Sequence, residues 1–155
     1  MLINLTEDLS LDAPPDEVWK LLRDTQRFAG FLPGVESVAR SNSEAAEEYT
    51  AKVSEKVGPF KVTLNLAVSI TETTEPSLLK AAIKGADSLG LNRVTGSLQV
   101  ALHPSPAGTQ MHFEASIEVL GKLATLGAVP IRHRTTESFA TFARNIQGQF
   151  EKEQS

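Results

Sequence analysis

Two glutamates occupy positions where the sequence otherwise places apolar side chains. Glu7 shares the alternating phase of Leu5 and Leu9 in the first apolar segment. Glu55 shares the phase of Val53 in a later one. A carboxylate that faces a core is costly unless it is paired, protonated or reached by water. Each glutamate therefore predicts either a polar contact inside a ligand cavity, or a bulge or open strand end that returns it to solvent.

The three histidines do not have the spacing of a metal site or a catalytic set. His103, His112 and His133 are scattered and do not match the helical HExxH pattern. The chain has no cysteine, which excludes thiolate ligands and cysteine nucleophiles. It also has no GxSxG, phosphate-loop or dinucleotide motif. We therefore predict no catalytic residue, no metal and no resident cofactor.

A compact basic cluster, Arg132, His133 and Arg134, follows the apolar segment 123–131. Beside a lipophilic cavity, such a cluster can meet an acidic protein surface or anionic lipid headgroups. The competing interpretation is a solvated helix end. We take the three residues as a candidate membrane or partner surface.

Length and charge set the class of protein. The 155 residues suit one domain, 1–155, by the rule of roughly 150 residues per domain. The net charge of -4 disfavours binding to nucleic acid. The N-terminus lacks the pattern of a secretory signal, and no apolar run reaches the roughly 20 residues that span a bilayer. We expect a cytoplasmic protein, with peripheral contact at the inner face of the membrane as an open alternative.

The elements that must position these residues follow from periodicity. Residues 2–11 alternate as a half-buried strand, and a helix starts near the prolines at 14 and 15. A second short helix is predicted over about 25–31, ended by Pro33-Gly34. Residues 35–119 alternate as about six further strands, and a 3.6-residue period after Gly121 predicts a long helix. The order favours an α+β helix-grip fold, in which a curved antiparallel sheet of about seven strands wraps the C-terminal helix.

Small residues on the inner strand phases, among them Ala51, Ala81, Gly85 and Gly96, would leave a cavity between sheet and helix, or would permit close packing instead. The candidate wall residues share an inward phase on the strands or the apolar stripe of the helix. They are Val53, Glu55, Val57, Leu64, Leu66, Ala81, Ile83, Leu98, Phe113, Ile117, Phe139 and Phe142, with Phe28, Phe31 and Leu126 expected nearer the mouth.

Four stretches carry a family resemblance that extends over roughly residues 3–150. They are APPDEVW at 13–19, FLPGVES at 31–37, KVGPFKV at 56–62 and GKLATLG at 121–127. With them the chain resembles the G-subunit family of carbon monoxide dehydrogenase, within the START-like superfamily that includes polyketide cyclases.

The resemblance implies a helix-grip fold around an apolar cavity. It also implies a non-catalytic accessory role beside a molybdenum hydroxylase of the carbon monoxide dehydrogenase type, in which the protein binds a lipophile such as a quinone or other isoprenoid. Longer family members append a tail and an apolar anchor, which this sequence does not show after Phe150. Two alternatives stay open: a cyclase or dehydratase that uses Glu55 or Glu7 for proton transfer, and a ligand-free assembly factor.

Overall fold

The computed structural model describes residues 1–41 and 47–150, in which one strand and two short helices precede six strands and a long helix. The elements are β1 (Leu2–Leu11), α1 (Pro15–Arg23), α2 (Thr25–Ala29), β2 (Val35–Arg40), β3 (Glu48–Val57), β4 (Phe60–Thr74), β5 (Leu78–Ala86), β6 (Asn92–Ser105), β7 (Gly108–Gly121), the short 3-10 helix η1 (Lys122–Leu126) and α3 (Ala128–Gln149).

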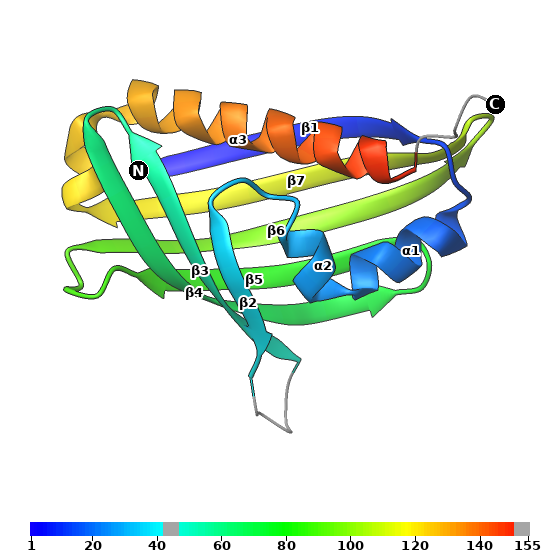
Figure 1. Cartoon of the computed structure of the whole chain (residues 1–155), viewed down its shortest axis with the longest axis horizontal. Coiled ribbons are helices and arrows are strands. Elements are labelled where there is room, and N and C mark those ends of the chain that lie inside the picture. Colours follow the sequence, from blue (N-terminus) through cyan, green and yellow to red (C-terminus); the bar gives the residue numbers. More distant parts are fainter. Residues whose placement is uncertain (42–46, 151–155) are drawn as a thin grey trace.

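The strands form one antiparallel sheet in the order β1-β7-β6-β5-β4-β3-β2. Each strand from β2 onward pairs with the next, and β1 closes the meander by pairing with β7. Figure 1 shows α3 running along one face of the sheet, with α1 and α2 near the end where α3 finishes. Because α3 contacts both β1 and β3, the sheet curves around the helix. The predicted helix-grip fold is confirmed.

The core follows the predicted phases. Inward residues of β6 and β7 such as Val100 and Met111 are fully buried, and Ile146 meets them from α3. A second buried cluster, which includes Ile3, Val119 and Ile131, lies where β7 passes into η1 and α3. Burial of apolar surface at about 25 cal/mol per Å² is what holds the helix against the sheet.

Two boundaries differ from the sequence prediction. The second short helix ends at Ala29, because the Phe31 N–H donates to the Phe28 carbonyl in a tighter three-residue turn. The residues after Gly121 first form η1, and α3 begins only at Ala128. Within the described ranges, no helix is both long enough and apolar enough to cross a membrane.

Candidate functional site

An apolar cavity lies between the inner face of the sheet and α3. It consists of a hollow of about 150 Å³ beside α2 and one of about 220 Å³ toward the start of α3. The two hollows adjoin, since the same six residues line both. These shared residues are Leu32, Val53, Leu66, Ile83, Ile117 and Phe139.

Most of the wall residues proposed from the sequence line one hollow or the other. Those at the hollow beside α2 are Phe28, Val53, Leu66, Ala81, Ile83, Leu98, Phe113, Ile117, Phe139 and Phe142. Those added by the hollow toward α3 are Glu55, Val57 and Leu64. Two residues lie elsewhere: Phe31 packs against the core cluster under α1, and Leu126 lines a separate surface depression. Neither Phe31 nor Leu126 lines either hollow.

The small residues serve two different purposes. Ala51 and Ala81 line the hollow beside α2, where a larger side chain would take up its space. Gly85 instead permits close approach of two strands, because a Cβ there would lie 2.5 Å from the carbonyl oxygen of Asn65. Both predictions for the small residues therefore hold in part: Ala51 and Ala81 border empty space, and Gly85 allows close packing.

Four phenylalanines, one from α2, one from β7 and two from α3, pack together in the cavity wall. The rings of Phe28 and Phe142 meet edge to face with centroids 5.2 Å apart, and those of Phe113 and Phe139 lie 5.1 Å apart. Such pairs contribute about 0.5–1.5 kcal/mol each beyond their burial. Part of the cavity wall is therefore aromatic.

One polar cluster interrupts the apolar wall of the larger hollow. The Arg134 Nε–H donates to Glu55 Oε2 at 2.8 Å, and Arg134 Nη2 lies 2.7 Å from the same oxygen. The Ser138 hydroxyl donates to Glu55 Oε1 at 3.0 Å. The Glu55 side chain is 20% exposed and that of Arg134 is 37% exposed. Glu55 does face the cavity, and pairing offsets the cost of its burial.

The three residues of the predicted basic cluster do not share one environment. Arg134 turns inward to Glu55, whereas Arg132 and His133 stay exposed on the surface of α3. Arg134 and Ser138 are four residues apart and share one face of the helix. That spacing opposite an inward glutamate is a signal that sequence reasoning could have used.

Glu7 lies on the inner phase of β1 and is half-buried, opposite Phe113 in the register with β7. It lines neither hollow. It is therefore not placed to act on a molecule in the cavity.

His112 faces the outer side of β7, between two carboxylates. Its Nδ1 lies 2.7 Å from Asp8 Oδ1 and its Nε2 lies 2.9 Å from Glu114 Oε1. Hydrogen bonds to Glu114 and then Asp8 raise the pKa of His112 above its ordinary value of 6.5. No group of three or more His, Asp or Glu side chains in residues 1–41 and 47–150 is arranged to hold a metal ion.

The raised pKa of His112 predicts a pH-dependent contribution to stability. The folded state binds the proton more tightly than the unfolded state, so the contribution is present below the ordinary pKa and is lost as pH rises through the folded one. We therefore expect the Tm of the wild type, measured relative to that of His112→Gln, to fall as the pH rises through neutrality. The change should be a few degrees, which corresponds to less than about 1 kcal/mol. Parallel Tm profiles would contradict this.

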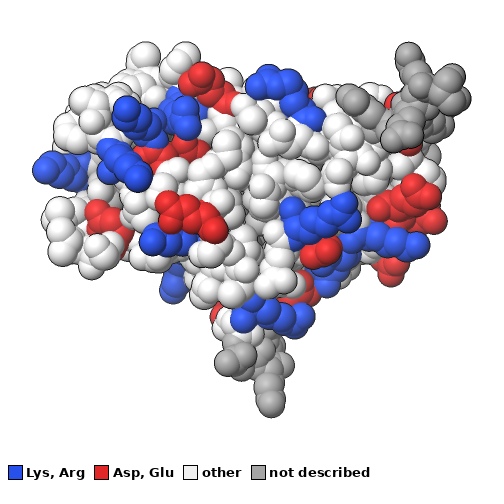
Figure 2. Space-filling model, in the orientation of Figure 1, with Lys and Arg blue, Asp and Glu red and all other residues white. Residues whose placement is uncertain are grey.

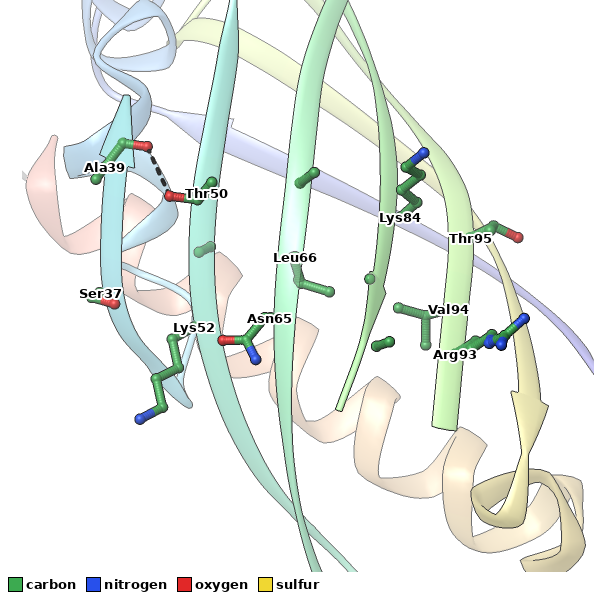
Figure 3. Close-up of a pocket in the computed structure, with 14 residues that line it drawn as sticks. Ser37, Ala39, Thr50, Lys52, Asn65, Leu66, Lys84, Arg93, Val94 and Thr95 are labelled. Carbon is green, nitrogen blue, oxygen red and sulfur yellow. Dashed lines mark hydrogen bonds between the residues drawn. The ribbon is translucent and has the colours of Figure 1, made fainter. Parts of the chain in front are cut away.

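The outer face of the sheet carries a wide groove of about 680 Å³ that the sequence analysis did not identify. Register places Lys52 beside Asn65 and Lys84 beside Thr95. Residues of β2 line the groove as well, so it crosses β2 to β6. Figure 3 shows Lys52, Lys84 and Arg93 pointing away from one another rather than toward a common centre. The groove therefore lacks the converging donors that a single small anion requires.

A curved sheet closed by a long helix around an apolar cavity defines a START-like, helix-grip protein. Solved structures of this class resemble the chain in fold. A conserved protein from Geobacillus kaustophilus is 22% identical, with 97% of this chain and 95% of that one covered and a TM-score of 0.80. The Zhui aromatase/cyclase from Streptomyces sp. R1128 is 13% identical, with coverage of 96% and 93% and a TM-score of 0.68. A START superfamily protein from Mycobacterium smegmatis is 10% identical, with coverage of 96% on both sides and a TM-score of 0.61.

Residues 8–150 match the family model of CoxG, described as the G subunit of carbon monoxide dehydrogenase. The chain belongs to this family, which confirms the resemblance drawn from its sequence. No curated protein matches the chain.

Proposed function

We propose that this protein is a non-catalytic accessory protein that binds a hydrophobic small molecule, a quinone or other isoprenoid, and assists a carbon monoxide dehydrogenase-type molybdenum hydroxylase at the cytoplasmic membrane. The observation that carries the proposal is an apolar cavity with one polar cluster in its wall. The family description supports the partner, because the CoxG family is named after a subunit of that enzyme.

The size and lining of the cavity favour an apolar ring or prenyl chain. A hollow of about 150 Å³ lined by aliphatic and aromatic groups holds a benzene-sized molecule. The adjoining hollow of about 220 Å³ extends that space toward Glu55 and Arg134. Burial at about 25 cal/mol per Å² would supply most of the binding free energy, less the costs of ordering the ligand.

The polar cluster favours a neutral headgroup over an anionic one. Glu55 cancels the charge of Arg134, and Glu137 Oε2 lies 4.0 Å from Arg134 Nη1. A carboxylate in the cavity would compete with Glu55 and meet no net positive charge. A neutral carbonyl can accept from Arg134 without breaking the pair, since guanidinium carries five N–H donors. Quinone carbonyls meet this requirement and fatty acids do not.

A cyclase-type activity is the second candidate, because Glu55 lines the cavity and a solved aromatase/cyclase shares the fold. A general base needs a carboxylate oxygen within reach of substrate. Both Glu55 oxygens already accept hydrogen bonds from Arg134 and Ser138. The geometry thus favours ligand binding over proton transfer. A substrate that the wild type converts and Glu55→Gln does not would reverse this preference.

The deciding experiment is native mass spectrometry of the purified protein, followed by organic extraction and by titration with a short-chain ubiquinone or with palmitate. We expect the quinone to bind and palmitate to bind more weakly. An extracted protein that takes up neither, yet still binds the hydroxylase, would instead favour a ligand-free assembly factor.

Arg134→Met should weaken quinone binding about tenfold, because it removes a hydrogen bond from a charged donor worth about 1.5 kcal/mol or more. Arg132→Met is the matched control, since Arg132 is exposed on the same helix and does not line the cavity. Titration of both variants with the short-chain ubiquinone measures the difference. Equal affinities would remove Arg134 from headgroup recognition.

A further inference from the structure

Large apolar side chains are exposed together at one end of the molecule. This end, here called the tip, consists of residues 56–61, 88–93 and 120–133: the β3–β4 turn, the β5–β6 turn, and the passage from β7 through η1 into α3. Figure 1 shows these segments meeting at the left end of the view. The exposed apolar residues of the tip are Phe60, Leu89, Leu91, Leu120 and Val129. Leu89 and Val129 are the most exposed, at 78% and 80%.

The tip is held in shape by contacts between distant parts of the chain. The Lys122 N–H donates to the Leu91 carbonyl at 2.9 Å, which joins η1 to the β5–β6 turn. Phe60 from the β3–β4 turn lines the same depression of about 210 Å³ as Leu91 and Lys122. The apolar side chains are thus presented by a folded surface.

The tip is also basic in an acidic protein. Its three segments, together with Asp87 at the start of the β5–β6 turn, contain five Lys or Arg residues and one Asp, whereas the whole chain has a net charge of -4. The five are Lys56, Lys61, Arg93, Lys122 and Arg132, all exposed. Figure 2 shows several blue side chains beside white surface at this end of the molecule, with red side chains among them.

We propose that the tip docks on the surface of an anionic lipid bilayer. Apolar side chains that project from separate segments can enter the boundary between headgroups and acyl chains, while Lys and Arg around them meet lipid phosphates. A second copy of the chain is a poorer occupant, because a self-complementary interface would bring the five cations against one another. The combination of apolar points and cations fits a lipid surface best.

The tip adjoins the cavity, so docking would bring the cavity close to the bilayer. This functional role of docking rests on the proposed function. Val62 and Leu123 line both the tip depression and the larger hollow of the cavity. A docked tip would therefore place the end of the cavity that holds Glu55 and Arg134 next to the lipid, where a quinone resides.

The test is co-sedimentation with vesicles of phosphatidylcholine alone and of phosphatidylcholine mixed with phosphatidylglycerol. We expect binding to the mixed vesicles that weakens with salt and little binding to the neutral ones. Lys61→Glu/Lys122→Glu should lower partitioning by at least about 25-fold, at about fivefold for each basic residue removed. Leu89→Asp/Val129→Asp should lower it about tenfold by removing apolar contact.

Arg144→Glu is the matched control, because Arg144 is an exposed arginine near the other end of α3. It should partition within about threefold of the wild type, since a charge far from the lipid surface is screened. Wild type left in the supernatant, or tip variants that sediment as well as the wild type, would overturn the proposal. So would loss of binding to the purified hydroxylase in tip variants that still sediment, which would assign the tip to a protein partner.

Failure of docking is distinguishable from failure of the cavity proposal. The tip variants should take up a short-chain ubiquinone in vesicle-free solution as the wild type does, because none of the four substituted residues lines either hollow. Equal loss of uptake and sedimentation would show a damaged fold, which a Tm measurement would detect. Leu89→Ser/Val129→Ser, a milder pair on the same exposed positions, would then carry the test.

Discussion

Gly34→Ala is expected to lower the free energy of unfolding by about 3 kcal/mol, because the backbone and its surroundings both oppose a side chain there. Gly34 has φ of 90°, in the region that costs other residues about 1–2 kcal/mol. A Cβ would also lie 2.5 Å from the Ser54 carbonyl oxygen and 2.8 Å from Glu55 Oε1. Overpacking of this kind costs about 1–3 kcal/mol more. Urea unfolding at equilibrium measures the total.

Gly58→Ala is the matched control. Gly58 also has positive φ, 59°, but a Cβ there would meet nothing within 4 Å. Its cost should be limited to the backbone penalty of about 1–2 kcal/mol. The difference between the two variants therefore measures the contact of Gly34 with Ser54 and Glu55. Equal losses would show that the loop moves aside, and that a side chain at position 34 does not press on Ser54 or Glu55.

The sequence predicted the strands and the long helix because their periodicities are strong and unambiguous. Of the six alternating apolar positions in β4, all but the exposed Phe60 are buried or half-buried, and the bounds of β1 are those expected from residues 2–11. Short, weakly periodic pieces were harder to place. The 3-10 turn of Lys122–Leu126 depends on the Lys122 N–H reaching the Leu91 carbonyl, a contact between distant residues that no local pattern encodes.

The cavity wall was predictable for the same reason as the strands, since inward phase alone selects Val53, Ala81 and Ile117. The alternating pattern could not predict which side chain pairs with an inward polar group. Glu55 and Arg134 are 79 residues apart, and only the curvature of the sheet brings β3 under the third helix. The tip was not predicted for the same reason, because Phe60, Leu91 and Val129 come from three separate parts of the chain, the start of β4, the β5–β6 turn and the start of α3.

Ala81→Phe is expected to abolish most lipophile binding while the protein stays folded. Ala81 is 3% exposed, and it lines the hollow of about 150 Å³ beside α2. A cavity of that size holds a benzene ring, so the new phenyl group would occupy the space that a ligand needs. We expect quinone affinity to fall at least about tenfold, with a stability change that ranges from a slight gain to the 1–3 kcal/mol loss typical of overpacking.

Ala82→Phe separates occupation of the cavity from the general effect of adding a phenyl group to β5. Ala82 is the next residue of the strand and is exposed on the outer face. Because neighbouring strand residues point to opposite faces, this ring lies in solvent and the cavity stays open. Ala82→Phe should bind the short-chain ubiquinone as the wild type does. If Ala81→Phe stays folded and also binds the short-chain ubiquinone as the wild type does, the ligand does not occupy the hollow beside α2. The larger hollow toward the start of α3, which Ala81 does not line, would then be the remaining site between sheet and helix.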